Sequence, residues 1–253
     1  MKKATFLKYN KPLLTCMVQA DNPDRIEELI DASIPEGAEA FGMQFCRMKR
    51  EYRTEQTYKR LFEMAAPYPI YVTNYRQGYN EGKSDEELAE ELITLARCGA
   101  TICDFTGDLF DKREGEFTDD ECAVAKQIEL AHSIHAEGAE VMISSHICRF
   151  TDAEQVLRMG LEYERRGADI FKVVVGADNM EQQIENLRII DLLKKKLRIP
   201  FLLLSSGECS LLRRIGGSLG CCMYLCVHEH DELSTKSQPL LSDMVKIRDL
   251  LGQ

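Results

Sequence analysis

The chain has 253 residues, of which 44% are hydrophobic and 29% are charged, a composition typical of one large globular domain or two small ones. The formal net charge of −10 disfavours non-specific binding to nucleic acid or to anionic membranes, although a few arginines in a pocket would still attract an anionic small molecule. No apolar run approaches the roughly 20 residues of a membrane-spanning helix, so we expect a soluble protein.

Ten cysteines are present, and their positions argue against disulfide bonds. Cys221 and Cys222 are adjacent, while Cys16 and Cys103 lie within apolar runs. The first 14 residues are basic but lack the apolar stretch and cleavage site of a signal peptide. We therefore expect free thiols in the reducing environment of the cytoplasm.

Eight short apolar runs alternate with amphipathic segments of helical period. Ser84 and Glu87 form a capping box, and Gly99, Gly138 and Gly167 stand where helices should end. The predicted strands are residues 13–18, 40–45, 69–75, 100–106, 140–147, 169–175, 200–205 and 221–227, and the clearest helices are 84–98, 119–136, 151–166 and 180–197.

Strict alternation of strand and helix predicts parallel strands joined by right-handed crossovers. Eight such units favour a closed (β/α)₈ barrel, a TIM barrel. The alternative is an open doubly wound sheet, which usually has a glycine-rich first turn, whereas residues 18–22 contain no glycine. No linker interrupts the pattern, so we expect a single domain over residues 1–253.

Lys172 interrupts the apolar run at residues 169–175. Lysine is almost never fully buried without a partner or a chemical role. If Lys172 and Val174 share the inward face, the amine projects into the barrel mouth, where desolvation and nearby cations would favour the neutral amine that attacks a carbonyl group. The alternative is a lysine whose stem packs while its ammonium group reaches water.

His146 stands near the end of the preceding run, residues 140–147. Adjacent strands lie about 4.8 Å apart, so residues at matching heights can reach one substrate. Histidine titrates near neutrality and is the most frequent general acid or base. A lone histidine at a strand end is more often structural, but the neighbouring Lys172 favours a role in proton transfer.

Two arginines are candidates for binding an anion. Arg213 follows the seventh predicted strand and Arg76 follows the third. A guanidinium group can hold a carboxylate through two hydrogen bonds. Both positions are also compatible with an ordinary solvated surface, so the pattern alone leaves the two interpretations open.

Three further segments carry residues that suit a binding site or a loop. His228 and His230 could ligate a metal, but no third ligand of recognisable spacing accompanies them, and we expect neither metal nor cofactor. The glycine-rich residues 216–220 precede a strand and predict a tight helix exit. The charged residues 108–120 form either part of a mobile lid or a solvated surface excursion.

These residues, taken together and in this order, resemble the type I 3-dehydroquinate dehydratases along nearly the whole chain. The shared patterns include a histidine closing the fifth strand, a lysine between hydrophobic residues in the sixth, and an arginine followed by spaced glycines. The patterns fall on residues 144–146, 167–172, 212–221, 234–238, 73–76 and 81–83.

The resemblance implies that Lys172 forms an imine with a substrate ketone. His146 would remove the proton beside that carbon and then protonate the departing hydroxyl group, while Glu81 would orient the histidine. The substrate-binding residues that the resemblance implies are Arg213 and Arg76 for a carboxylate and Ser234 and Gln238 in a lid over the ring.

One segment departs from the family. Its strand-two pattern of Glu-Leu-Arg falls on Gly42, Met43 and Gln44, so the acidic and basic substrate contacts are replaced and Gln44 is the polar group left there. Losing a charge-assisted contact typically costs about 1.5–3 kcal/mol. Imine chemistry is therefore expected to survive, while the substrate stays open.

Three functions are compatible with this pattern. The first is a Schiff-base lyase that dehydrates 3-dehydroquinate to 3-dehydroshikimate in the shikimate pathway, which the lid residues favour. The second is a class I aldolase-like barrel acting on another keto acid, which the strand-two losses favour. The third is a catalytically silent relative that binds a metabolite. The expected partner is an anionic keto acid, not nucleic acid or a membrane, and family members are often dimers, which leaves a homodimer open.

Overall fold

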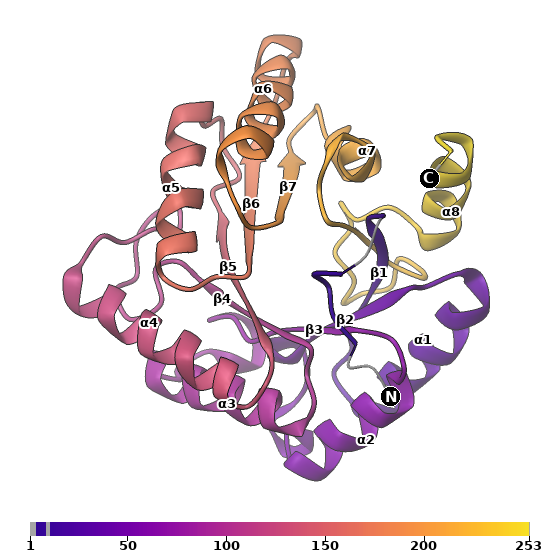
Figure 1. Cartoon of the computed structure of the whole chain (residues 1–253). Coiled ribbons are helices and arrows are strands. Elements are labelled where there is room, and N and C mark those ends of the chain that lie inside the picture. Colours follow the sequence, from indigo (N-terminus) through magenta and orange to yellow (C-terminus); the bar gives the residue numbers. More distant parts are fainter. Residues whose placement is uncertain (1–3, 9–10, 253) are drawn as a thin grey trace.

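The computed structural model describes residues 4–8 and 11–252 and shows eight parallel strands that alternate with eight α-helices (Figure 1). The first 14 residues, in which no signal peptide is expected, lie partly outside the described residues. The strands are β1 (Leu13–Val18), β2 (Ala40–Gln44), β3 (Ile70–Thr73), β4 (Ile102–Thr106), β5 (Glu140–His146), β6 (Ile170–Gly176), β7 (Phe201–Ser206) and β8 (Met223–Cys226). The helices are α1 (Pro23–Glu36), α2 (Glu55–Ala65), α3 (Asp85–Cys98), α4 (Glu121–Ala136), α5 (Ala153–Arg165), α6 (Met180–Lys196), α7 (Leu212–Leu219) and α8 (Leu241–Leu250), with short 3₁₀ turns η1 (Phe45–Arg47), η2 (Arg50–Tyr52) and η3 (Gly78–Asn80).

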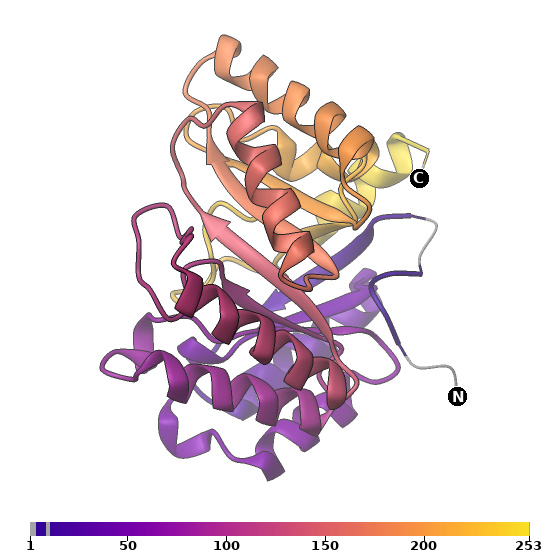
Figure 2. The same ribbon diagram turned by 60° about the vertical axis from the view of Figure 1, so that its left-hand side comes forward.

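The strands form a nearly closed barrel, which confirms the predicted TIM-barrel fold in one domain. Their order is β7-β6-β5-β4-β3-β2-β1-β8, and every neighbouring pair is parallel. The seam between β7 and β8 is bridged where the backbone N–H of Cys222 donates to the carbonyl of Phe201 at 3.0 Å. Because the order follows the chain round without reversing, the open doubly wound sheet is excluded. The helices lie outside the strands (Figure 2).

The helix-capping residues predicted from the sequence are found at the ends of α3. The capping box between Ser84 and Glu87 is present at the start of α3, and Gly99 ends that helix with a left-handed φ of 118°. β3 is shorter than predicted and ends at Thr73; the side chain of the next residue, Asn74, accepts from Arg53 and Asn80. No helix within residues 4–8 and 11–252 is long and apolar enough to cross a membrane.

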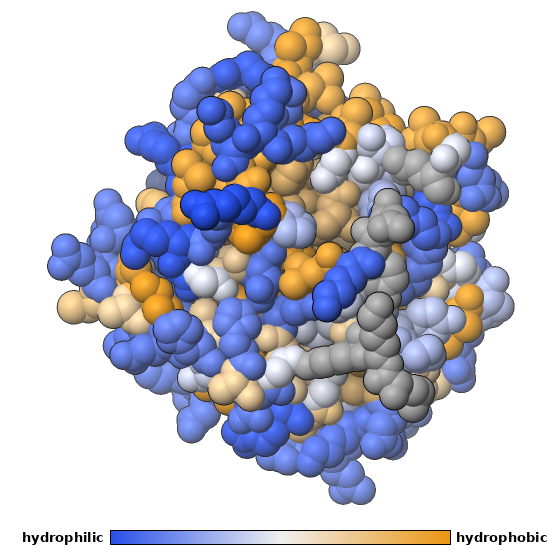
Figure 3. All heavy atoms as spheres, in the orientation of Figure 1, coloured by the Kyte–Doolittle hydropathy of each residue, from blue (hydrophilic) through white to orange (hydrophobic). Residues whose placement is uncertain are grey.

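Helix α6 carries apolar side chains on its outer face. Met180, Ile184 and Leu187 are exposed and follow the spacing that places residues on one side of a helix. Hydrophobic side chains gather over α6 at the upper edge of the space-filling view, whereas hydrophilic side chains dominate much of the rest of that face (Figure 3). The barrel core therefore does not use every apolar residue of this helix.

Candidate active site

A cavity of about 630 Å³ opens at the carboxyl ends of the strands, the end of a parallel barrel where active sites lie. Most of the site residues predicted from the sequence line it. These residues are Lys172, His146, Arg213, Arg76, Gln44 and Gln238. The remaining two predicted residues, Glu81 and Ser234, are not part of its lining.

Lys172 points from β6 into the cavity together with Val174, which confirms the predicted inward face. Only 3% of the residue is exposed, so the alternative in which its ammonium group reaches water does not hold. The ammonium group donates to the hydroxyl oxygens of Tyr71 and Tyr75, both at 2.8 Å, and to Oδ2 of Asp104 at 3.0 Å. Its three protons thus meet three acceptors, and the buried charge is fully hydrogen-bonded.

Asp104 on β4 is the ion-pair partner of Lys172. Its Oδ2 also accepts from the hydroxyl groups of Tyr71 and Tyr75, while its buried Oδ1 has no hydrogen-bond partner among the described residues. Burial, reinforced by the charge of Asp104, raises the pKa of both tyrosines well above the usual value, so both hydroxyl groups stay protonated. Nearby cations were expected to act on this lysine, whereas the charged group in contact with it is the carboxylate of Asp104.

His146 closes β5 beside the lysine. The register pairs Lys172 with Ser144 and His146 with Val174, so His146 lies two residues further towards the carboxyl ends of the strands, and both side chains line the cavity. The ring nitrogen Nδ1 lies 2.7 Å from Oε2 of Glu116, and the ring packs edge-on against Tyr75 with centroids 5.1 Å apart. A proton on Nδ1 shared with the carboxylate leaves Nε2 as the nitrogen available to a substrate.

Glu116 takes the place that the sequence assigned to Glu81. It accepts from both the ring and the backbone N–H of His146. Burial alone would raise the pKa of Glu116, but these hydrogen bonds outweigh burial and lower that pKa below its usual value. Glu81 instead is exposed at the end of η3, where its carbonyl accepts from Arg50. The charge of segment 108–120 was the available signal for Glu116, but nothing in the pattern singled out this residue.

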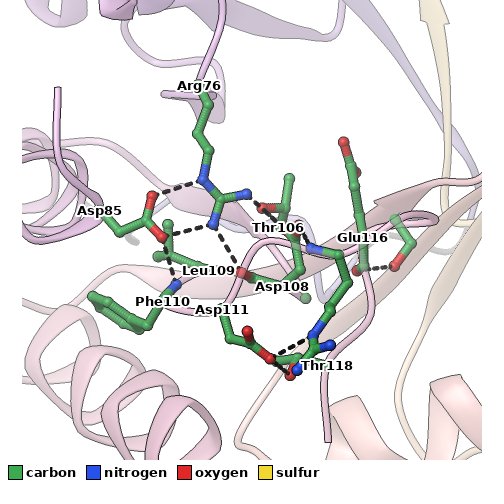
Figure 4. Close-up of polar contacts among 12 residues, drawn as sticks. Arg76, Asp85, Thr106, Asp108, Leu109, Phe110, Asp111, Glu116 and Thr118 are labelled. Atoms are coloured by element: carbon green, nitrogen blue, oxygen red, sulfur yellow. Dashed lines mark hydrogen bonds and ion pairs between the residues drawn. The ribbon is translucent and has the colours of Figure 1, made fainter. Parts of the chain in front are cut away.

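The segment after β4 is bonded to neighbouring parts of the fold (Figure 4), while Lys112, Arg113 and Glu114 at its tip are exposed. Arg166, which is 1% exposed, donates to the carbonyls of Gly107 at 3.1 Å and Thr118 at 2.6 Å. Glu116 itself has a φ of 53°, a left-handed conformation that costs free energy in a residue other than glycine. The contacts that anchor the loop therefore hold Glu116 in a backbone conformation that it would not keep in an unanchored loop.

Arg76 binds Asp108 in this loop. Figure 4 shows its guanidinium group between Asp85 and Asp108. It donates to both carboxylate oxygens of Asp85 at 2.6 and 2.7 Å, and to the side chain and the carbonyl of Asp108 at 2.8 Å each. Burial would lower the pKa of Arg76, but the two carboxylates outweigh it and raise that pKa. Arg76 lines the cavity, but its charge is already neutralised, so the geometry does not present it as the free carboxylate clamp that the sequence suggested.

Arg213 presents the opposite case. It is 7% exposed, and its Nε donates to the carbonyl of Ser205 at 2.8 Å, yet no acidic residue among those described pairs with it. Desolvation lowers the pKa of this arginine, which is the direction expected of a buried cation without a counter-ion. A bound carboxylate would supply that counter-ion.

The loop after β8 approaches the cavity from the other side. Gln238 is buried, and its Oε1 has no hydrogen-bond partner among the described residues. Ser234 turns away from the cavity and donates to the carbonyl of Asp231, so Thr235 lines the cavity instead. Thr235 contacts Gln19, whose side chain also bonds Gln44. The partners are Thr235 N to Gln19 Oε1 at 2.8 Å, and Gln19 Nε2 to Gln44 Oε1.

The two histidines considered for a metal lie on separate partners. His228 is 2.7 Å from a carboxylate oxygen of Glu36, and His230 is 2.9 Å from the carbonyl of Gln238. Within residues 4–8 and 11–252, no group of three or more histidine, cysteine, aspartate or glutamate side chains is arranged to hold a metal ion.

Comparison with solved structures places the fold among 3-dehydroquinate dehydratases. The enzyme of Geobacillus kaustophilus HTA426 superimposes with a TM-score of 0.82 at 16% identity, covering 97% of this chain and 93% of that one. The type I enzyme of Clostridium difficile, solved with covalently modified comenic acid, gives 0.80 at 14% identity over 97% and 94%. An aldolase, QR15, is more distant, with a TM-score of 0.55 at 13% identity over 95% and 96%. No curated protein matches the chain.

A family model, described as type I 3-dehydroquinase, matches residues 108–253, which is more than half of the chain. The matched part carries Glu116, His146, Lys172 and Arg213. The part before it carries Gln44 and the two tyrosines that contact the lysine. The family model thus covers strands β5 to β8 and these four residues, and leaves β1 to β4 unmatched. The chain belongs to the type I 3-dehydroquinase family.

Proposed function

We propose that the protein is a lyase that captures the carbonyl group of a carboxylate-bearing substrate as an imine on Lys172 and dehydrates it with His146. One observation carries this proposal: a buried lysine, a carboxylate-bonded histidine and an arginine without an acidic partner line the same cavity. Membership of the family makes 3-dehydroquinate, or a close relative, the first candidate substrate.

Imine formation requires Lys172 to give up a proton. Asp104 is in direct contact with the ammonium group and has a free buried oxygen, Oδ1, that can accept this proton. The neutral amine then attacks the carbonyl carbon, and the carbonyl oxygen leaves as water after two protonations. The resulting protonated imine draws electrons from the neighbouring carbon and acidifies its C–H bond.

Dehydration follows on the side of His146. Its Nε2 removes the proton from the carbon beside the imine, and the electron pair of that C–H bond forms the enamine. The same nitrogen then protonates the hydroxyl group on the next carbon, which departs as water while the double bond shifts. Glu116 stabilises the imidazolium ion between these two steps through its 2.7 Å contact with Nδ1. Hydrolysis of the imine releases the product and restores the lysine.

Arg213 would hold the substrate carboxylate, and Gln238 would donate or accept at the lid. A second candidate function, aldol-type cleavage of a carbon–carbon bond in another keto acid, uses the same imine. Gln44 favours it, because this neutral side chain is bonded to Gln19 where the family has charged substrate contacts. The two candidates differ in the bond broken after the imine forms.

Turnover of 3-dehydroquinate, followed by the absorbance of its conjugated enone product, tests the proposal. The His146→Gln variant is expected to lose about 10²–10⁴-fold in rate. The Lys172→Met variant should show no turnover. His135→Gln is the matched control, because His135 lies on α4 and pairs with Asp169 outside the cavity. A wild-type rate in His146→Gln would contradict the assigned role. Carbon–carbon cleavage of another keto acid without dehydration would favour the second candidate.

We also propose that the protein works in the cytoplasm. All ten cysteines are free thiols, and such a number suits a reducing compartment. Cell fractionation of the tagged chain tests this, and recovery from an oxidising compartment would contradict it.

A further inference from the structure

Arg47 is a cation of the cavity for which the proposed chemistry has no use. It ends η1, the single turn that follows β2, and its side chain lines the cavity. Its Nε is buried without a hydrogen-bond partner, and no described residue forms an ion pair with its guanidinium group. A buried donor without a partner is costly, and the cost is recovered when a ligand supplies the acceptor.

The other charged groups of the lining do not compensate Arg47. The acidic residues of the cavity wall, Asp108 and Glu116, are bonded to Arg76 and His146 respectively. Within the described residues, Arg47 and Arg213 are therefore buried or half-buried arginines of the lining that lack an acidic partner.

Neutral amides flank Arg47. Gln44 directly precedes the turn, and the amide of Gln77 contacts Sγ of Cys46. Both amides line the cavity and carry N–H donors that suit an anion. The chain as a whole has a net charge of −10, so this part of the wall is a local exception that attracts anions into a concave site.

Arg47 lies on a different side of the barrel mouth from Arg213. Strand β2 is four strands from β6 along either path through the barrel, so the turn that carries Arg47 lies across the mouth from Lys172 (Figure 1). Arg213 follows β7, the strand that pairs with β6. A substrate whose carbonyl carbon is at Lys172 would reach Arg213 beside it and Arg47 on the far wall.

We propose that Arg47 forms a second anion-binding subsite, so that the protein acts on a carbonyl compound with two anionic groups, one held by Arg213 and one by Arg47. Because 3-dehydroquinate has a single carboxylate, this substrate would be a relative of it with one further anionic group. The second group is a carboxylate or a phosphoryl group, which share the charge and the acceptor oxygens that a guanidinium group recognises. The choice of a carbonyl compound rests on the proposed imine chemistry; the subsite itself rests on Arg47 and its neighbours.

Equilibrium binding of length-matched acids tests the subsite. Calorimetry would compare 2-oxoglutarate with 2-oxopentanoate, 2-oxoadipate with 2-oxohexanoate, and 4-oxoheptanedioate with 4-oxoheptanoate, because each pair differs in one terminal carboxylate. In at least one pair the dianion is expected to bind about 10- to 100-fold more tightly than the monoanion. Replacing the terminal carboxylate of 2-oxoglutarate by a phosphonate shows which anion the subsite prefers, and a preference of either kind supports it.

Variants locate the effect. Arg47→Gln should abolish the preference for the dianion and leave monoanion binding unchanged, whereas Arg213→Gln should weaken both. Lys49→Gln is the matched control, because it removes the same charge two residues away at an exposed side chain paired with Asp21. Equal affinity within every pair, or a preference that survives Arg47→Gln, would overturn the subsite.

Failure of the subsite and failure of the imine are distinguishable. A preference for dianions that depends on Arg47, without any borohydride-trapped adduct on Lys172, would keep the subsite and refute the imine chemistry. Adducts that form with monoanions and dianions alike, together with unchanged binding in Arg47→Gln, would keep the imine chemistry and refute the subsite.

Discussion

Replacing Asp104 by asparagine tests the buried ion pair directly. The pair joins Lys172 Nζ to Asp104 Oδ2 at 3.0 Å, and the side chains are 4% and 0% exposed. Asparagine keeps the shape of the side chain and one acceptor oxygen but removes the charge. Leaving a buried charge without its partner typically destabilises a protein by about 3–5 kcal/mol. In a chain of this length each kcal/mol lowers Tm by about 2–4 °C, so we expect a fall of about 6–20 °C.

The assay is chemical or thermal unfolding of Asp104→Asn, Lys172→Met and the double variant. If the instability of Asp104→Asn comes from the unpaired ammonium group, removing that group should restore stability. The double variant should then be at least as stable as Asp104→Asn alone, with a coupling free energy of about 0.5–3 kcal/mol. Strictly additive losses in free energy would refute the ion pair as the reason why a lysine is tolerated in this strand.

Three further expectations concern the loop, the thiols and one glycine. The folded-state pKa of Glu116 is lowered, so its stabilising contact with His146 is complete above the usual glutamate pKa and is lost as pH falls through the lowered value. The Tm of the wild-type protein should therefore fall over that acidic range. The Glu116→Gln variant should lack this part of the fall in Tm. A methyl group on Gly107 would lie 1.7 Å from the hydroxyl oxygen of Tyr163, so Gly107→Ala should cost about 1–3 kcal/mol in urea unfolding, and an unchanged midpoint would contradict the packing. Iodoacetamide should label the exposed cysteines of the native protein and spare the buried ones, as peptide mass mapping can show. The exposed ones are Cys122 and Cys148; the buried ones include Cys16 and Cys221, whose pKa values burial raises to about 11 and about 12.

Sequence patterns predicted the barrel and the position of Lys172 because both depend on short-range regularities. Apolar runs separated by amphipathic segments require a layered α/β fold, and a lysine within one of these runs has to face the barrel interior or reach water. Asp104 shows the same anomaly in β4, where a carboxylate stands in an apolar run. Applying the same rule to that strand would have identified the partner of Lys172.

The loop residues could not be predicted in this way. Residues distant in the chain hold Glu116 beside His146. Arg166 binds the backbone at Gly107 and Thr118, and the hydroxyl groups of Ser145 and Tyr163 donate to the carbonyl of Glu116. No periodicity records such a contact between residues so far apart in the chain. Glu81 was assigned from the resemblance of residues 81–83 to the family pattern, whereas the structure places Glu116 against His146.

The central claim is that Lys172 forms an imine, and borohydride reduction in the presence of 3-dehydroquinate tests it most directly. Mass mapping of the reduced protein is predicted to locate one adduct on the peptide that contains Lys172, with none in Lys172→Met. The His146→Gln variant separates imine formation from proton transfer, because it should still form the reduced adduct on Lys172. Failure of every carbonyl compound tried to form an adduct on Lys172, in protein shown to be folded, would contradict the account and favour a relative that binds its metabolite without chemistry.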